Sequence, residues 1–318
     1  MFIKSKRSIL IFCIALILLT GSLVIAVSVL PMEVAGINRP LYKWVDDLWK
    51  SIWDDHLFAQ QLRSHSILIP FELLPGSNCP LVQVRLDKTP EVPFLLDTGC
   101  DSLLIDPSLI KHHPIIRTQI NFKSSLGGSP VCEATNLDTI SFGEVVLHRK
   151  VAFIYSIDRH LWPFCGILGS TALRDKCFTV DYKKKRLIFR NSDQISTQEQ
   201  FVPFVDEGSL DSFWERVVPS LNAPTPLVRA ELDGHEMVFL VDTGTMYNYI
   251  SKISYEHLAG KDGKGFKFLK IGTETFQNPT FQIAPYLPRG MGILGSTFLK
   301  NFRTTFDYTN RRIFFQKN

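Results

Sequence analysis

The sequence predicts an all-β protein built from two similar lobes, and two observations support this fold class. The first is an internal repeat that begins near residue 66, in which short apolar strands alternate with turn residues. The second bears on size alone: 318 residues, 45% hydrophobic and 21% charged, are globular values, and the length fits one large domain or two ordinary ones. We expect the lobes at residues 66–197 and 198–318, with the polar stretch 191–200 as the linker between them.

Each copy of the repeat opens with two strands joined by a turn. In the first copy, residues 80–87 lead to 93–99, and in the second, residues 226–233 lead to 238–244. Both segments read as a strand, a turn and a buried strand that ends in Asp-Thr-Gly.

Each copy closes with the same hexapeptide, Gly-Ile-Leu-Gly-Ser-Thr, at residues 166–171 and 292–297. An Asp-Tyr pair follows at the same distance in both copies, and then come a basic turn and an apolar strand. We expect only short helices after the Gly-Ser-Thr elements.

The two aspartates suggest a chemical role. One Asp-Thr-Gly triplet is explained equally well as a turn after a strand, but two copies in matching surroundings are not. Two carboxyl groups held about 3 Å apart cannot both ionise, so they share a proton. The ionised group can then take a proton from water while the protonated group polarises a scissile carbonyl. Asp97 and Asp242 are therefore the candidate catalytic pair.

The sequence resembles the aspartic proteases of the pepsin and retropepsin superfamily over about residues 66–318. The resemblance rests on the two Asp-Thr-Gly triplets and on Ile-Leu-Gly at residues 167–169 and 293–295. It implies a bilobal acid-protease fold and an aspartic endopeptidase that cleaves extended polypeptide segments. It also implies that Asp97 and Asp242 bind and activate the catalytic water, without a metal or another cofactor. Since one chain carries both lobes, a monomer should form the catalytic unit.

The resemblance also assigns supporting roles around the aspartates. Thr98 and Thr243 would brace the two loops against each other through bonds from hydroxyl to backbone. Gly99 and Gly244 would allow the tight loop geometry. Two short strands would pass behind the loops and support them; their residues are Ile167, Leu168, Gly169, Ile293, Leu294 and Gly295.

The first copy is longer than the second between its Asp-Thr-Gly triplet and its hexapeptide. We place a substrate-covering flap in this extra length at about residues 121–137, with its tip at Gly127 and Gly128. An ordinary surface hairpin is the alternative. The segment lacks the tyrosine that pepsin-type flaps usually carry, so the chemistry of the flap stays open.

A second departure from the family is Cys100, whose counterpart in the other copy is Thr245. A thiol is a weaker hydrogen-bond donor than a hydroxyl, so the two aspartates are expected to be unequal. Five cysteines follow the N-terminal segment, and an odd number leaves at least one without an intramolecular bridge. A disulfide from Cys100 to Cys165 is one hypothesis.

Residues 8–30 form an uncharged, nearly continuous apolar run, which is long enough to cross a bilayer. We predict an uncleaved anchor at residues 1–30, and a cleavable secretory signal is the alternative. Basic residues before the run and acidic residues after it predict a cytoplasmic N-terminus and an exported protease. No glycosylation acceptor occurs in the sequence, which favours a bacterial periplasm.

Residues 31–65 are expected to form a juxtamembrane linker that contains an amphipathic helix at 41–62. Three interpretations of this helix stay open: tryptophans at the headgroup level, packing on the protease body, or an inhibitory segment that places Lys43 at the active site.

Other classes of function fit less well. No CxxC motif occurs, and His112-His113 is better explained as a loop than as a zinc site. The 35 basic and 31 acidic residues form no strong basic run beyond the first few positions, which argues against nucleic-acid binding. A retropepsin-like fold used for binding or scaffolding at the membrane, without hydrolysis, is the main alternative. A purely structural membrane protein would leave the duplicated loops unexplained.

Overall fold

The computed structural model describes residues 62, 65–100, 102–110, 114–121, 131–174, 176–195, 200–205, 225–258 and 265–317. The predicted anchor, most of the amphipathic helix, the flap tip and the boundary between the lobes lie outside these residues. Within them, no helix is long and apolar enough to cross a membrane. Residues Asp54–Asn318 form one compact unit.

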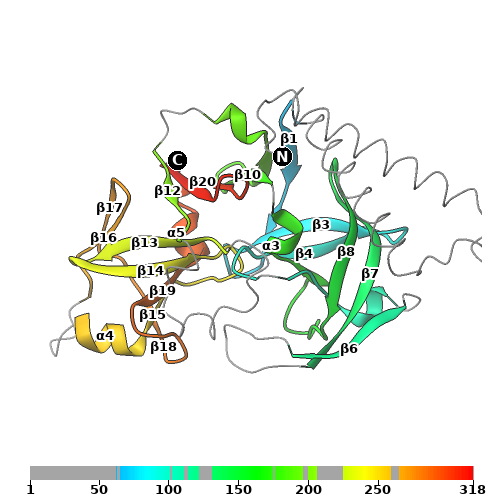
Figure 1. The fold of residues 1–318 in the computed structure, drawn as a ribbon, viewed down its shortest axis with the longest axis horizontal. Helices are drawn as coiled ribbons and strands as arrows, with labels where there is room; N and C mark the ends of the chain where they lie inside the picture. The colour runs from blue at the N-terminus through cyan, green and yellow to red at the C-terminus, as the bar shows by residue number, and fades with distance from the viewer. Residues whose placement is uncertain are drawn as a thin grey trace, which may run out of the picture. The chain divides into compact units, whose positions relative to one another are not determined.

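The described residues are mostly β-sheet, which confirms the all-β prediction (Figure 1). The first copy builds an eight-stranded sheet in the order β2-β3-β4-β9-β5-β8-β7-β6. Its strands are β2 (Glu72–Leu73), β3 (Pro80–Leu86), β4 (Val92–Leu96), β5 (Leu104–Ile105), β6 (Ile115–Asn121), β7 (Val131–Phe142), β8 (Val145–Ile154) and β9 (Gly166–Leu168). The long strand β7 also pairs with β3, so the sheet folds back on itself.

The second copy builds a seven-stranded sheet in the order β17-β16-β13-β14-β19-β15-β18. Its strands are β13 (Leu227–Leu232), β14 (His235–Val241), β15 (Tyr249–Ser251), β16 (Phe268–Ile271), β17 (Glu274–Gln277), β18 (Gln282–Ala284) and β19 (Met291–Leu294). The strand pairs expected at the start of each copy are therefore present as β3–β4 and β13–β14.

The third sheet has six strands and takes members from both copies, in the order β1-β11-β10-β20-β21-β12. Its strands are β1 (Ile67–Pro70), β10 (Cys177–Asp181), β11 (Arg186–Phe189), β12 (Val202–Pro203), β20 (Phe302–Asp307) and β21 (Arg312–Lys317). At its centre β10 runs antiparallel to β20, and Thr179 pairs with Thr305, its counterpart in the repeat. Their hydroxyl oxygens lie 2.7 Å apart, which marks an approximate two-fold axis between the copies.

The helices are short, as the sequence predicted. The four-residue helices α3 (Ser170–Leu173) and α5 (Ser296–Leu299) each begin directly after an Ile-Leu-Gly strand. The structure also has α4 (Lys252–Leu258) and two 3-10 turns, η1 (Pro107–Leu109) and η2 (Ser192–Gln194).

The tight turns repeat as faithfully as the strands. Three pairs of counterparts have positive φ angles that differ by at most 3°: Asp87 and Asp233 (48° and 46°), Gly143 and Gly272 (56° and 58°), and Lys185 and Arg311 (48° and 51°). Because side chains disfavour this left-handed region, its recurrence at equivalent non-glycine positions shows that both copies form the same turns.

Successive side chains of a strand point to opposite faces of the sheet. As a result, one set of residues packs in a large hydrophobic core and the other set in smaller clusters. Phe94 and Leu96 of β4 enter the main core, whereas Leu95 between them joins a cluster on the opposite face. In the second copy, Phe239 and Val241 of β14 enter the main core, while Leu240 faces the other way.

Leu62 shows where the predicted amphipathic helix meets this body. The side chain is buried in the main core, and its carbonyl oxygen accepts a hydrogen bond of 3.4 Å from Gln194 Nε2. Leu62, the C-terminal residue of the predicted helix, therefore packs on the β-sheet body.

Candidate active site

The two aspartates stand at the ends of equivalent buried strands. Asp97 follows β4 and Asp242 follows β14. Strand β9 runs parallel to β4, and β19 runs parallel to β14. The Asp97 amide donates to the Leu168 carbonyl (3.2 Å) and the Asp242 amide to the Leu294 carbonyl (3.0 Å). Each aspartate is thereby fixed to an Ile-Leu-Gly strand.

The structure brings the two carboxyl groups together across the two copies. A methyl group placed on Gly99 would lie 2.5 Å from Asp242 Oδ2, and one placed on Gly244 would lie 2.5 Å from Asp97 Oδ2. Each carboxyl group thus packs against the glycine of the other loop, in space that no side chain can share.

Thr98 and Thr243 connect the loops through four hydrogen bonds. The Thr98 hydroxyl donates to the Val241 carbonyl (2.8 Å), and the Thr243 hydroxyl donates to the Leu96 carbonyl (2.7 Å). Each hydroxyl also accepts the other threonine's amide at 3.1 Å. Both side chains are buried, so these bonds form a fully satisfied polar link inside the protein.

The Ile-Leu-Gly strands support the loops from behind. A methyl group on Gly169 would lie 2.2 Å from the Ser102 carbonyl oxygen, and one on Gly295 would lie 2.3 Å from that of Tyr247. Ile167 and Leu168 pair with β4, as Ile293 and Leu294 pair with β14. Only glycine permits such a close approach of loop and strand.

The two carboxylates differ in the hydrogen bond from the residue after each Asp-Thr-Gly triplet. The donor is the backbone amide of Cys100 for Asp97 and the hydroxyl of Thr245 for Asp242. Asp97 Oδ1 accepts the amides of Gly99 (3.0 Å) and Cys100 (2.8 Å). Asp242 accepts the Gly244 amide on Oδ1 (2.8 Å) and the Thr245 hydroxyl on Oδ2 (2.7 Å). The Cys100 thiol, at the position of that hydroxyl, donates to the Ser102 carbonyl at 3.3 Å.

The electrostatics of the pair favour a shared proton. Burial among the atoms of both loops raises the pKa of the Asp97 carboxyl well above its ordinary value. The negative charge of Asp242 and a hydrogen bond with it raise this pKa further, against the lowering effect of the Cys100 and Gly99 amides. One carboxyl group of the pair is therefore protonated where an isolated aspartate would be ionised.

Two further residues support the loops, and the sequence did not single them out. Cys79 is buried, and its Sγ lies 3.4 Å from the Gly244 carbonyl oxygen and 3.5 Å from Ser296 Oγ. Asn248 accepts the Gly295 amide at 3.0 Å and donates to the Thr280 carbonyl at 3.1 Å. Only the place of Cys79 directly before a repeated strand distinguishes it in the sequence.

Several other predictions can be placed. Strands β6 and β7 pair as an antiparallel hairpin, but its connection at 122–130, with Gly127 and Gly128, lies outside the described residues. The five cysteines after the N-terminal segment form no disulfide, including the suggested one from Cys100 to Cys165. Instead, Cys165 Sγ lies 2.8 Å from Arg159 Nη1. Across the part of the chain that is described, no cluster of His, Cys, Asp and Glu could hold a metal ion.

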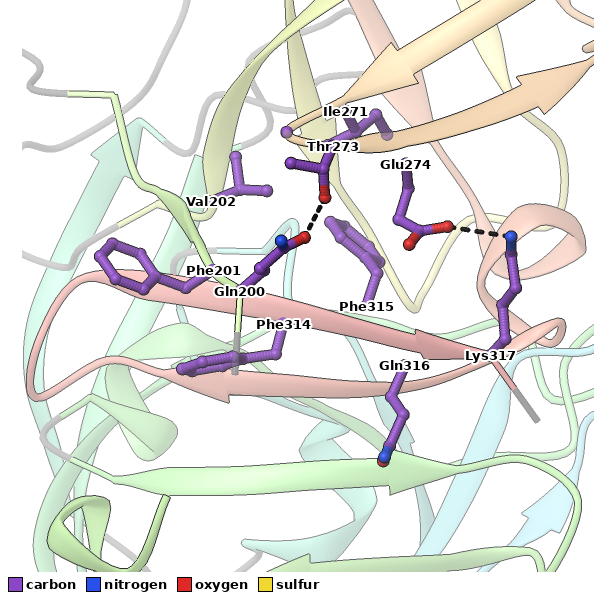
Figure 2. Close-up of a pocket in the computed structure, with 11 residues that line it drawn as sticks. Gln200, Phe201, Val202, Ile271, Thr273, Glu274, Phe314, Phe315, Gln316 and Lys317 are labelled. Carbon is purple, nitrogen blue, oxygen red and sulfur yellow. Dashed lines mark hydrogen bonds and ion pairs between the residues drawn. The ribbon is translucent and has the colours of Figure 1, made fainter. Parts of the chain in front are cut away.

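A separate cavity of about 610 Å³ opens between β12, β21 and the β16–β17 hairpin (Figure 2). Figure 2 shows Phe201 and Phe314 on one side and the ion pair between Glu274 and Lys317 on the other. None of its lining residues belongs to an Asp-Thr-Gly loop, so this cavity is distinct from the candidate active site.

Comparison with known proteins agrees with the predicted resemblance. Residues 82–172 match a family model described as aspartyl protease, a segment that includes Asp97 and the first Ile-Leu-Gly strand. No curated protein matches the chain. The matched segment, residues 82–172, is therefore similar to the aspartyl proteases.

Proposed function

We propose that this protein is an aspartic endopeptidase with a bilobal acid-protease fold, in which Asp97 and Asp242 activate the hydrolytic water. The observation that carries this proposal is the packing of each carboxyl group against the glycine of the opposite loop. The family match covers the first copy alone and does not assign a second carboxyl group, so the packing of Asp242 against Gly99 supports Asp242 in that role.

The chemistry follows from one proton shared by two acids. The ionised carboxyl takes a proton from water as the water oxygen attacks the peptide carbonyl carbon, while the protonated carboxyl donates to the carbonyl oxygen. The tetrahedral intermediate then collapses as the amide nitrogen gains a proton and the C–N bond breaks. The enzyme forms no covalent bond to its substrate.

The difference between the two loops suggests which carboxyl group carries the initial proton and which acts as the base. The Thr245 hydroxyl donates to Asp242 Oδ2, while burial and the charge of Asp242 raise the pKa of the Asp97 carboxyl and favour its protonated form. We assign the initial proton to Asp97 and the role of base to Asp242, although the pair titrates as a unit.

We further propose that the apolar run at residues 8–30 anchors the enzyme, with the protease body on the exported side, in a bacterial periplasm. The substrates would then be extended polypeptide segments at that side of the membrane. Both aspartates come from one chain, so a monomer suffices for catalysis.

The test is cleavage of a mixed peptide library by the full chain in detergent, from about pH 3 to about pH 7, beside Asp97→Asn. We expect cleavage by the unmodified chain and a loss of about 10²-fold or more in the variant. Equal cleavage by both would refute the role of the pair. If neither protein cleaves any peptide, and the unmodified chain is shown to be folded, the result would support a binding module instead.

A further inference from the structure

The six-stranded sheet ends in β1 on one side and in β12 on the other, and these two edge strands are counterparts in the repeat. Residues 69–71 read Ile-Pro-Phe, and residues 202–204 read Val-Pro-Phe. In each copy the amide of the phenylalanine, Phe71 or Phe204, donates to a carbonyl of the turn before the neighbouring strand, at 3.0 and 2.8 Å. The two edges therefore begin in the same register.

The two edges differ in how far they extend. Strand β1 pairs with β11 at four positions, as far as Ile67 opposite Phe189. Strand β12 pairs with β21 at only two positions, and Val202 opposite Ile313 is the last of them. In the part of the chain that the structure describes, no strand pairs with residues 314–317 on that side of β21.

The uncovered edge of β21 presents backbone hydrogen-bonding groups. In an antiparallel pair, the residues that exchange hydrogen bonds with the neighbouring strand alternate along the chain. The Arg311 carbonyl points to the β12 side, because it accepts the Phe204 amide. By this alternation, Phe315 and Lys317 direct their N–H and C=O groups to the same side. Such an edge is a template for one more strand.

Two sequence differences explain why the second edge stays uncovered. Ile67 is buried in the main core, but its counterpart Gln200 is exposed and accepts a hydrogen bond from the Thr273 hydroxyl. Val145 is fully buried in the first copy, and its counterpart is Glu274. Because burial of polar groups without partners is costly, Gln200 and Glu274 leave open the apolar space that two aliphatic side chains fill in the first copy.

The cavity in Figure 2 lies at this place. Its volume of about 610 Å³ falls within the range of about 300–1,000 Å³ that is typical of ligand sites. Val202, Ile271 and Phe315 pack with the main core and give the cavity its apolar part. The ion pair between Glu274 and Lys317, at 2.9 Å, lies on the other side of the Phe315 ring in Figure 2.

We propose that this cavity and the uncovered edge of β21 form a docking site for an extended segment of another polypeptide. The segment adds to the sheet beside Phe315 and Lys317 and places one aliphatic side chain in the cavity, in the manner of Ile67 on the equivalent edge. None of the residues that line the cavity belongs to an Asp-Thr-Gly loop, so the docking site goes beyond the proposed peptidase function and does not depend on it.

The first copy shows which chemistry the occupant needs. There the edge is covered by an extended stretch in which buried Ile67 and Ile69 alternate with Leu68, which is 51% exposed. Phe201, the counterpart of Leu68, is 50% exposed, so the outward position is already equivalent in the two copies. A peptide supplies backbone partners for the edge of β21 as well as an apolar side chain, whereas a small apolar molecule would supply only the latter.

The test is photo-crosslinking of a synthetic peptide to the full chain in detergent. The peptide has the sequence of residues 64–69, Ser-His-Ser-Ile-Leu-Ile, with p-benzoylphenylalanine at the position of Leu68. We expect mass spectrometry to map the crosslink to residues 271–274 or 314–317. A peptide with aspartate at the position of Ile67 should crosslink several-fold less. Capture only at the Asp-Thr-Gly loops or elsewhere, equal capture of both peptides, or no capture would overturn the proposal.

Variants of the chain provide the matched controls. Gln200→Ile gives the second edge the residue of the first, so it should fill the cavity and reduce the crosslink to background. Lys317→Pro removes an edge amide and the side chain, whereas Lys317→Ala removes only the side chain; the proline variant should therefore lose several-fold more crosslink. An undiminished crosslink in Gln200→Ile, or equal yields from the two Lys317 variants, would contradict docking on this edge. The pair of peptides on the unmodified chain keeps the proposal falsifiable if a variant fails to fold.

Discussion

The two copies of the repeat agree closely at their Asp-Thr-Gly loops and differ in the hairpins farther along each copy. Each loop supplies one carboxylate, one bracing threonine and one close-packed glycine, with distances that match within about 0.2 Å. Beyond the loops, the first copy has β7 of 12 residues and β8 of 10, whereas β16 and β17 of the second copy have 4 each. Geometry is therefore duplicated where the carboxyl groups meet, and the hairpins are free to diverge.

The loops themselves differ at one position, where the first has Cys100 and the second has Thr245. The hydroxyl of Thr245 donates to its aspartate, while the thiol of Cys100 donates to a backbone carbonyl. Two loops with nearly the same backbone thus give their aspartates different surroundings.

The largest effect is expected from the glycines at the centre of the comparison. Gly99→Ala or Gly244→Ala would place a methyl group within 2.5 Å of the opposite carboxyl group and force the loops apart. Because a displacement of about 1 Å at reacting groups costs about 10²-fold in rate, we expect a loss of at least that size in both variants. Peptide cleavage by the full chain measures it.

Gly265→Ala is the matched control, because a methyl group at Gly265 meets nothing within 4 Å and the residue has no positive φ. Activity should be retained in this variant. Retention of activity in only one of the two loop variants would show that one loop tolerates the added methyl group and the other does not.

Substitution of a bracing threonine should have a smaller effect than substitution of a loop glycine. The effect should be the same for the two threonines. Thr98→Val removes two of the four hydrogen bonds and leaves the Val241 carbonyl and the Thr243 amide without their partner. Thr243→Val does the same to the Leu96 carbonyl and the Thr98 amide. Since each unsatisfied buried group costs about 1–3 kcal/mol, both variants should lose about 2–6 kcal/mol of unfolding free energy in urea titrations.

Thr304→Val is the control for that measurement. Thr304 is fully buried, and its hydroxyl forms no hydrogen bond among the described residues, so its removal should be nearly neutral or stabilising. Unequal losses at Thr98 and Thr243 would mean that one loop is held by contacts that the other lacks.

Much of this arrangement could be predicted because it is local and duplicated. Alternation of apolar residues, turn residues and two identical hexapeptides predicted the strand pairs, the short helices and the loops that carry the two aspartates. The structure also brings the predicted residues of the two loops together, while their catalytic roles stay a proposal.

The remaining features depend on contacts between distant segments, which leave no local pattern. The pairing of β10 with β20 needs two strands more than a hundred residues apart, and neither sequence shows a preference for the other. Cys79 contacts Gly244 of the second loop, which lies 165 residues farther along the chain. The 122–130 connection lies outside the described residues, so the flap stays a prediction.

The smallest effect is expected from an exchange at Cys100, the position at which the two loops differ. Cys100→Thr would give Asp97 the hydroxyl donor that Asp242 already has, and a donor to the ionised form lowers the pKa of a carboxyl group. The last proton of the pair would then leave at lower pH, so the alkaline limb of the rate profile should move to lower pH. The rate profile of peptide cleavage against pH measures this shift.

Stability offers a second measurement of the same exchange, with a defined sign. The folded protein raises the pKa of Asp97, so this group's contribution to stability is fully present below its unfolded pKa and is lost as pH rises through the folded value. Cys100→Thr lowers that folded pKa and should therefore reduce the loss of unfolding free energy between acid and neutral pH. Cys100→Ser, which also supplies a hydroxyl, should act in the same direction, whereas Cys100→Ala should not. If serine and alanine behave alike, the hydroxyl of Thr245 is not what makes the two aspartates unequal.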